Sequence, residues 1–233
     1  MSGTRRGGEL TGTSFALLGL LAARRAGWSG YELAQQMQRS LGFFWPRALR
    51  NIYDEVKLLA DRGLARSKDE RVGQRPRTVY SITAAGRREL TAWLGRPSAP
   101  LTLESEALVR VFFAENGTVE DLLAAIRSVR EQAEAADEQV AEIVRGHGTE
   151  GGPFPERLHL AALMGQLMHT HRQTLRAWAD WAEEQVSSWS GTRLGDGATI
   201  PAGVFEQIAD GAALRSRGAS RGERAGRHPP RRR

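Results

Sequence analysis

The sequence of 233 residues has no cysteine, only two lysines and no long apolar run. The lack of cysteine excludes disulfides, thiolate zinc sites and cysteine nucleophiles. No stretch reaches the roughly 18 uncharged apolar residues that a membrane helix needs, and residues 1–13 lack the apolar core of a signal peptide. We therefore expect a cytoplasmic protein that does not enter a membrane.

Charge is divided along the chain. Residues 1–97 contain 17 lysines and arginines against 8 acidic residues, a net charge of +9. Residues 98–213 contain 8 against 18, or −10, and residues 214–233 contain 8 against 1, or +7. A basic region favours a polyanionic partner, whereas an acidic region is repelled by one. The two large regions are therefore expected to have different functions.

Residues 13–97 show the pattern of a small helical domain. Residues 13–23 are too apolar for an exposed helix and predict one that lies in a core. A second helix is predicted over residues 30–41. Ser29 can accept a hydrogen bond at its start, and Glu32, three residues later, completes a capping box.

A third helix and a β-hairpin follow. Pro46 suits the first position of a helix, and apolar residues at intervals of three and four continue to Gly63, which suits a left-handed cap. Short strands over 64–67 and 77–82 would enclose a charged loop. With a closing helix that starts at Thr83, this order of elements predicts a winged helix-turn-helix.

Beyond a Gly- and Pro-rich linker at residues 95–100, the sequence predicts an α-helical domain. A helix over 101–114 would precede two long helices, the first capped by Thr118 and the second spanning 156–189, with a loop at 146–155 between them. Their apolar residues recur every three or four positions over several heptads, so each long helix needs a partner along its length. We expect an antiparallel helical hairpin that also joins two subunits.

The predicted fold class is mainly α with a small β-hairpin wing. Four segments are expected: a flexible N-terminus (1–12), a winged helix-turn-helix DNA-binding domain (13–97), an α-helical dimerisation or effector domain (101–190) and a flexible tail (191–233), basic from residue 214. The tail arginines could add a salt-sensitive attraction to DNA, and a passive tail is the alternative.

Five short segments occur in a characteristic order in the first domain. They are Leu17-Leu18-Gly19-Leu20-Leu21, Ser29-Gly30-Tyr31-Glu32-Leu33, Asn51-Ile52-Tyr53, Arg62-Gly63-Leu64 and Val79-Tyr80-Ser81-Ile82-Thr83-Ala84-Ala85-Gly86. Each is weak alone, but their order and spacing together resemble the PadR family of transcriptional regulators. Beyond Pro97 the resemblance rests on the helical architecture.

The resemblance implies a homodimer that binds a two-fold-related operator in double-stranded DNA, usually as a repressor. In many members of the family, a small effector binds the protein and releases it from the operator. This chain has Arg50-Asn51-Ile52-Tyr53-Asp54 where the family often has Gly-Ser-Ile-Tyr-Pro. Arg50 and Asn51 add side chains that can read bases, whereas the carboxylate of Asp54 would lie near phosphates. A MarR-like multidrug-responsive winged-helix repressor and a non-catalytic protein-interaction adaptor are the alternatives.

The candidate DNA-binding residues lie mainly on the third helix and the hairpin. Arginine can bridge guanine O6 and N7, and asparagine can bridge adenine N6 and N7. We therefore assign base reading to Arg47, Arg50 and Asn51. The candidates for phosphate or minor-groove contacts are Tyr31, Tyr53, Lys57, Arg71, Gln74, Arg75 and Arg77. For the tyrosines the alternative is a packing role, and for the hairpin it is a merely solvated charged surface.

Methionine and aromatic side chains at helical spacing could accept a small apolar or aromatic effector. The candidates for this pocket are Met164, Met168, Trp178 and Trp181, and ordinary core packing is the alternative. His169 and His171 point away from each other on a helix and have no carboxylate partner nearby, so no metal or other cofactor is expected. No phosphate-binding glycine loop or nucleophile elbow occurs, and we expect no catalytic residue and no enzyme.

Overall fold

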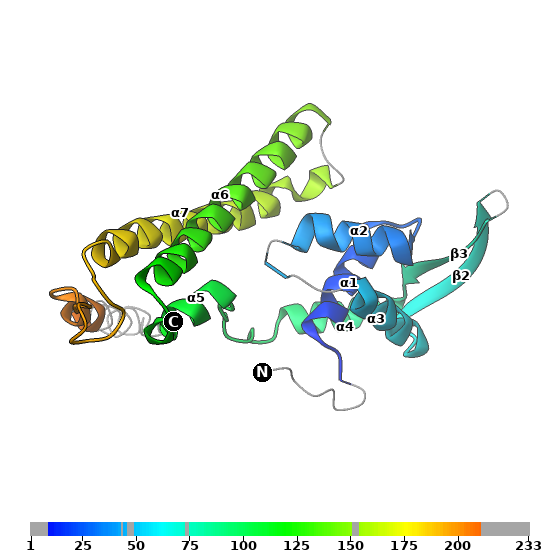
Figure 1. Cartoon of the computed structure of the whole chain (residues 1–233). Coiled ribbons are helices and arrows are strands. Elements are labelled where there is room, and N and C mark those ends of the chain that lie inside the picture. Colours follow the sequence, from blue (N-terminus) through cyan, green and yellow to red (C-terminus); the bar gives the residue numbers. More distant parts are fainter. Residues whose placement is uncertain (1–8, 43, 46–48, 73–74, 151–153, 211–233) are drawn as a thin grey trace, which may run out of the picture. The chain divides into compact units, whose positions relative to one another are not determined.

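The structure is a computed structural model (Figure 1). It describes residues 9–42, 44–45, 49–72, 75–150 and 154–210. The chain divides into two compact units, one formed by residues 1–103 with 146–168 and the other by 104–145 with 169–233. Most of the predicted N-terminal segment and the basic part of the tail lie outside the described residues.

The first unit is built on three helices around an apolar core. They are α1 (Gly12–Ala23), α2 (Gly30–Leu41) and α3 (Leu49–Asp61). All three helices contribute fully buried side chains, which are Leu17, Leu18, Leu21, Leu33, Met37, Ile52, Val56 and Leu59. Burial of these side chains from water supplies the main driving force for folding of this unit.

Side-chain caps set the starts of α1 and α2. The Ser29 hydroxyl accepts a hydrogen bond from the Glu32 N–H at 3.2 Å, and the Ser29 N–H donates to the Glu32 carboxylate at 2.8 Å. This confirms the capping box predicted for the second helix. The predicted start of the first helix at residue 13 is one residue late, because Thr11 and Ser14 form a capping box and α1 begins at Gly12.

A three-stranded antiparallel sheet, in the order β1-β3-β2, packs beside these helices. Its strands are β1 (Trp28–Ser29), β2 (Ala65–Val72) and β3 (Arg75–Ile82). The predicted strand over 64–67 is too short, because β2 continues to Val72. Polar pairs such as the Thr78 hydroxyl donating to the Asp69 carboxylate at 2.9 Å hold the outer hairpin together. The strand was predicted from the alternation of apolar residues, and this pattern does not detect polar cross-strand pairs.

Helix α4 (Ala84–Leu94) closes the first unit against α1. The Thr83 hydroxyl accepts a hydrogen bond from the Gly86 N–H at 3.0 Å, which confirms the predicted cap. A Cβ at Gly86 would lie 2.1 Å from the carbonyl oxygen of Leu64, so only glycine allows this close approach. The rings of Phe15 and Trp93 stack with centroids 4.7 Å apart.

The remaining helices are α5 (Glu106–Phe112), α6 (Val119–Glu150) and α7 (Leu158–Val186), with short 3-10 turns at Ala114–Asn116 and Pro155–Arg157. The predicted helix over 101–114 starts too early, because Ser105 caps α5. The predicted loop at 146–155 is also wrong at its start, since α6 continues through Gly146 and Gly148. Each glycine costs a helix about 1 kcal/mol, and this cost is tolerated in the last turns of a long helix.

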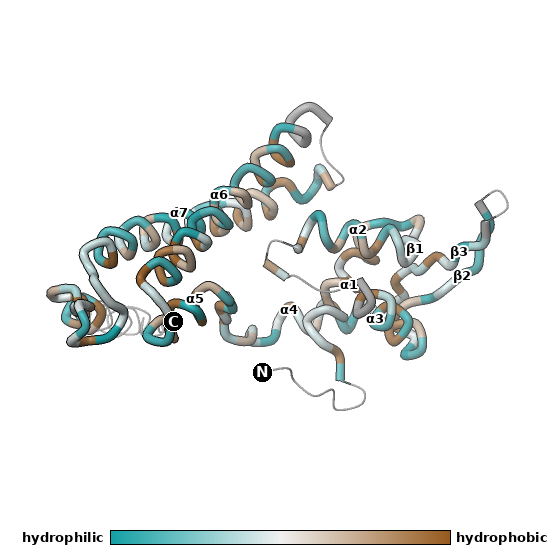
Figure 2. Tube along the Cα trace, in the orientation of Figure 1, coloured by the Kyte–Doolittle hydropathy of each residue, from teal (hydrophilic) through white to brown (hydrophobic). Residues whose placement is uncertain are grey.

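In the second unit, α6 and α7 run side by side and share a small apolar cluster. Figure 2 shows hydrophobic and hydrophilic residues alternating along both helices. The buried members of the cluster are Leu122, Ile126, Ala179, Ala182 and Val186. This pairing confirms the predicted helical hairpin over the stretch that lies in the second unit.

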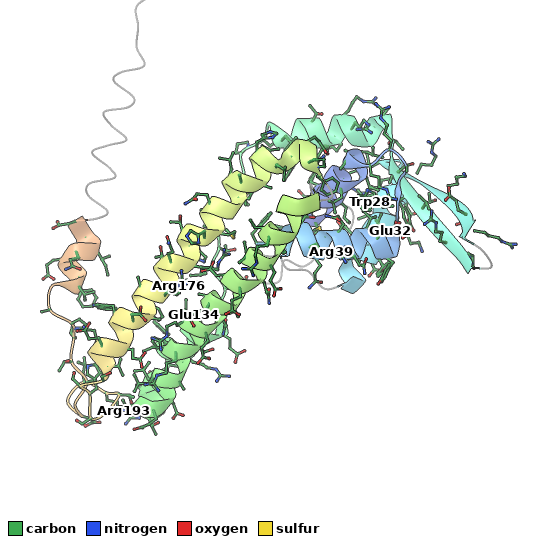
Figure 3. All side chains as sticks on the ribbon, turned by 90° about the horizontal axis from the view of Figure 1, so that it is seen from above. Trp28, Glu32, Arg39, Glu134, Arg176 and Arg193 are labelled. Atoms are coloured by element: carbon green, nitrogen blue, oxygen red, sulfur yellow. The ribbon has the colours of Figure 1, made fainter. Side chains whose placement is uncertain are left out.

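Ion pairs also join α6 and α7. Figure 3 draws the side chains of both helices, with Glu134 of α6 and Arg176 of α7 labelled. Glu183 accepts from Arg127 at 2.7 Å and from Arg130 at 2.8 Å. Further along, Asp137 accepts from the buried Arg172 at 2.5 Å and lies 3.1 Å from Arg176. The helices of this unit are therefore joined by charges as well as by apolar packing.

Candidate nucleic-acid interface

The outward side of α3 carries the predicted recognition residues. The inward side is occupied by Ile52, Val56 and Leu59, whereas Tyr53 is 43% exposed and Lys57 is also exposed. The side chains of the predicted base readers, Arg47, Arg50 and Asn51, lie outside the described residues, although positions 50 and 51 belong to the first turn of α3. Base reading by these three residues stays a prediction.

A shallow hollow of about 330 Å³ lies between the faces of α2 and α3. It is lined by Tyr31, Ala34, Gln35, Gln38, Arg39 and Tyr53. The Tyr53 ring rests against Gly30, where a Cβ would lie 2.8 Å from the ring. Tyr31 is 64% exposed, and its hydroxyl accepts a hydrogen bond from the Gln35 amide at 2.7 Å. The structure thus brings the two predicted tyrosines to one surface.

Sequence reasoning missed three polar residues of this hollow, Gln35, Gln38 and Arg39. Their positions are four, seven and eight residues after Tyr31, which places all of them on one side of a helix. This spacing could therefore have predicted that the three residues lie on the same surface as Tyr31. Amide and guanidinium groups beside two phenols make a surface that can donate several hydrogen bonds to an anion.

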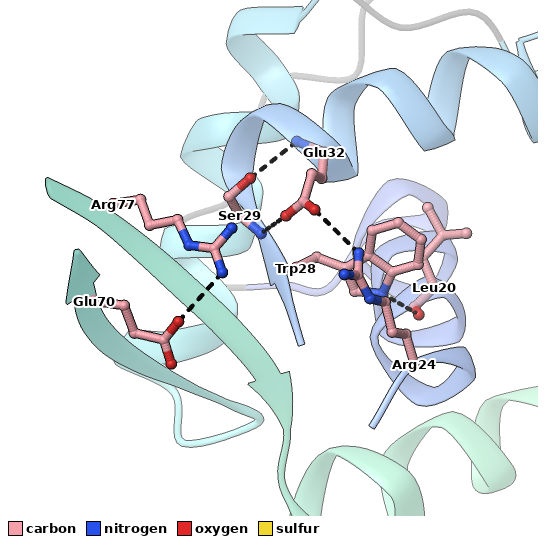
Figure 4. A network of polar contacts seen from close by, with 7 residues as sticks. All are labelled: Leu20, Arg24, Trp28, Ser29, Glu32, Glu70 and Arg77. Carbon is pink, nitrogen blue, oxygen red and sulfur yellow. Dashed lines mark hydrogen bonds and ion pairs between the residues drawn. The ribbon is translucent and has the colours of Figure 1, made fainter. Parts of the chain in front are cut away.

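The wing formed by β2 and β3 carries the other predicted cations. Arg71 and Arg77 are exposed, whereas Gln74 and the side chain of Arg75 lie outside the described residues. Arg77 is also paired with Glu70 at 3.3 Å (Figure 4). Glu70 lies 3.3 Å from the ammonium group of Lys68 as well. Hydrogen bonds from Lys68 and Arg77 lower the pKa of Glu70. The sequence prediction missed this carboxylate.

A second network fixes the start of α2 next to the sheet (Figure 4). The indole N–H of Trp28 donates to the carbonyl oxygen of Leu20 at 2.9 Å, and the guanidinium group of Arg24 lies 4.8 Å from the Trp28 ring. Arg24 also pairs with Glu32 at 3.1 Å. The backbone hydrogen bond from Ser29 lowers the pKa of Glu32. These contacts orient the helix that carries Tyr31.

The four candidates for an effector pocket all lie on α7 and are divided between the two units. Met164 and Met168 belong to the first unit, and Trp178 and Trp181 to the second. Trp178 packs against the apolar cluster of α6 and α7, whereas Trp181 is 40% exposed. The effector pocket stays a prediction.

One expectation about α7 is wrong. His169 has a carboxylate neighbour, Asp137, whose oxygen lies 3.8 Å from its Nδ1. The packing of α6 on α7 brings together residues that are distant in the sequence. Within the described part of the chain, however, no three histidine or carboxylate side chains are grouped closely enough to hold a metal ion. Nor is any helix there long and apolar enough to cross a bilayer.

Comparisons with known proteins match both parts of the chain. Residues 17–92 match the transcriptional regulator PadR-like family, and residues 104–187 match the family model described as virulence activator alpha C-term. The negative transcriptional regulator PadR of Bacillus subtilis is 33% identical over 101 residues, which cover 42% of this chain and 54% of that relative. The chain thus spans about half the length of this curated relative.

Solved structures of the Bacillus subtilis protein share the fold. Its complex with operator DNA has a TM-score of 0.61 at 20% identity and covers 74% of this chain and 98% of that chain. Its complex with p-coumaric acid has a TM-score of 0.56 at 21% identity and covers 75% and 98%. The predicted fold class, a winged helix-turn-helix followed by a helical region, is confirmed. Over residues 17–92, this chain is similar to the PadR-like family of transcriptional regulators.

Proposed function

We propose that this protein is a sequence-specific DNA-binding regulator that represses transcription from a two-fold-related operator. The observation that carries the proposal is the joint presence of an exposed polar side of α3 and a projecting basic wing in a domain of this family. The related Bacillus protein is a negative regulator and was crystallised with operator DNA. An α-helix fits the major groove, where base edges are distinguishable.

In this proposal the three surfaces of the first unit have separate roles. Arg50 and Asn51 in the first turn of α3, and Arg47 shortly before them in the sequence, read base edges. The wing contacts the sugar–phosphate backbone, and the hollow beside Tyr31 and Arg39 receives a phosphate. Phosphate contacts position a protein on the duplex, whereas base contacts give it sequence specificity.

We further propose that the protein acts as a homodimer. On α5, Val109, Phe112 and Phe113 are 55%, 79% and 56% exposed, and on α7, Leu163 and Leu167 are 70% and 54% exposed. Exposed apolar groups on this scale favour burial at an interface. A two-fold dimer would pair two α3 helices and match two operator half-sites.

The effector and the place of action are parts of the same proposal. The Bacillus relative was crystallised with p-coumaric acid, and we propose that a small aromatic or apolar molecule likewise releases this protein from DNA. A regulator of chromosomal genes would act in the cytoplasm and would need no catalytic residue. Release requires that the effector bind the DNA-free state more tightly than the DNA-bound state.

Selection of bound sequences from a random duplex pool tests the proposal. We expect enrichment of an inverted repeat and a footprint of two equal halves on DNA upstream of the protein's own coding region. Sedimentation analysis of the selected complex should give two chains per duplex. Failure to enrich any sequence would favour the protein-interaction adaptor instead.

A further inference from the structure

Two cations and one carboxylate share a face of the wing. In the β2–β3 ladder Glu70 lies directly opposite Arg77, and Lys68 lies two residues from Glu70, so all three side chains point to the same side of the hairpin. The two oxygens of Glu70 are divided between them, since Oε1 lies 3.3 Å from Lys68 and Oε2 lies 3.3 Å from Arg77. One carboxylate therefore engages both Lys68 and Arg77, and Figure 4 shows its pair with Arg77.

The neighbouring carboxylate has a different environment. Asp69 lies opposite Thr78 in the ladder and accepts a hydrogen bond from the Thr78 hydroxyl at 2.9 Å. Successive residues of a strand point to opposite faces, so Asp69 lies on the other face of the hairpin. The wing thus carries two adjacent carboxylates. Glu70 forms ion pairs with Lys68 and Arg77, whereas Asp69 accepts a hydrogen bond from a neutral hydroxyl.

The charge of Glu70 opposes binding of a polyanion at this face. Hydrogen bonds from Lys68 and Arg77 lower its pKa, so the group is ionised at neutral pH. A phosphate that approaches Arg77 must replace the carboxylate and is repelled by it as well. Ion pairs at exposed sites are weak, so this replacement is possible but reduces the gain from each phosphate contact.

We propose that Glu70 limits the sequence-independent affinity of the wing for DNA by competing with phosphates for Lys68 and Arg77. The inference rests on the proposed DNA-binding function and adds a residue that sets its strength and salt dependence. Phosphate contacts raise the affinity for every sequence alike, and a genome offers a very large number of competing sites. A carboxylate in the wing therefore reduces retention of the protein on unrelated DNA.

The test compares Glu70→Gln with Asp69→Asn in the full chain. Both variants remove one negative charge from the same hairpin, but only the first frees Lys68 and Arg77. Fluorescence anisotropy with a labelled duplex of random sequence, over a series of salt concentrations, measures affinity and its salt dependence. Glu89→Gln, which removes a carboxylate paired with Arg96 at 3.1 Å outside the wing, controls for net charge.

We expect Glu70→Gln to raise affinity for the random duplex about fivefold and to steepen the salt slope by about 1 to 2. Asp69→Asn and Glu89→Gln should each give a smaller rise and leave the slope close to that of the wild type. Adding Arg77→Ala to Glu70→Gln should remove most of the gain.

Three outcomes overturn the inference. If Glu70→Gln and Asp69→Asn behave alike, the effect is one of net charge, and the proposed function still stands. If Glu70→Gln weakens binding, Glu70 orients the cations toward DNA rather than withholding them. If the wild-type protein binds neither random nor selected duplex at low salt, the inference and the proposed function fail together.

Discussion

The two units obtain their packing in different ways. In the first unit, α1, α2 and α3 bury large side chains such as Leu18, Leu33 and Ile52 almost completely. In the second unit, the apolar cluster shared by α6 and α7 has fewer buried residues, and two of them, Ala179 and Ala182, are alanines. Charged residues, above all Asp137 and Arg172, supply many of the remaining contacts.

This difference corresponds to the proposed division of functions. A DNA-reading surface must be held in a fixed shape, and a dense apolar core provides it. A surface proposed to pair with a second copy would keep part of its apolar area exposed, as at Phe112 and Phe113 of the second unit. We therefore expect substitutions in the two units to differ in size and in the property they change.

The largest effect is expected in the first core. Leu18→Ala removes a fully buried side chain from α1 and should lower the free energy of unfolding by about 3 kcal/mol or more, because the cavity cannot collapse fully. Urea denaturation followed by circular dichroism measures the loss. Leu101→Ala, at a position that is 97% exposed, is the control and should change stability by less than about 0.5 kcal/mol. Equal losses would contradict the account of this core.

In the second unit, the largest loss of stability is expected from removal of the charge of Asp137. Asp137→Asn leaves the buried guanidinium of Arg172 without its anion and should cost about 2 to 3 kcal/mol. The control is Glu106→Gln, which breaks an exposed pair with Arg110 and should cost less than about 0.5 kcal/mol. A small loss at Asp137 would mean that Arg172 finds another partner or reaches water.

Acidification offers an independent test of Asp137. Burial opposes ionisation of this carboxyl, but the hydrogen bond from Arg172 and the charges of Arg172, Arg176 and His169 outweigh it and lower the pKa of Asp137. A lowered folded-state pKa contributes stability above the ordinary pKa of aspartate, about 3.8, and this contribution is lost as the pH falls through the lowered value. Urea midpoints of the wild type should therefore fall more steeply below about pH 4 than those of Asp137→Asn. Parallel curves would contradict the assignment.

The features that could be predicted from the sequence are those that depend on residues close to one another along the chain. The caps at Ser29 and Thr83 are visible because a helix start needs particular residues at fixed short spacing. Glu55 was not predicted to be buried, yet it is 5% exposed and accepts hydrogen bonds from the hydroxyls of Thr11, at 2.9 Å, and Ser14. Its partners are more than forty positions away, so only the packing of α1 on α3 reveals them.

The candidate site was predicted only in part for the same reason. Exposure of Lys57 follows from helical periodicity in α3. The same periodicity groups Tyr53 with the apolar positions, yet Tyr53 is 43% exposed. The pairing of Arg77 with Glu70 depends on hairpin register. The sequence prediction placed Glu70 in a loop, because the outer strands carry no apolar alternation. The sequence gives the number of cations in the wing, but cross-strand geometry determines which of them are paired with a carboxylate.

Within the unit proposed to read DNA, substitutions of base-contacting and phosphate-contacting residues should affect binding differently. Asn51→Ala is expected to cost about 1 to 3 kcal/mol at the selected operator and to relax the preference at one base pair. Arg75→Ala should weaken binding to the operator and to random DNA by similar factors. Titration of both duplexes with both variants measures this. An equal shift for operator and random DNA with Asn51→Ala would exclude a base-reading role.

The smallest losses of stability are expected from removal of a helix N-cap, which occurs in both units. Ser29→Ala removes a partly buried cap of α2 and should cost about 1 kcal/mol, whereas Thr118→Ala removes an exposed cap of α6 and should cost about half as much. The Ser29 variant should also weaken DNA binding, because α2 carries Tyr31 and Arg39, while the Thr118 variant should leave it unchanged. Urea denaturation and duplex titration separate the two readouts. If loss of the Thr118 cap weakened DNA binding as much as loss of the Ser29 cap, the division of functions between the units would be wrong.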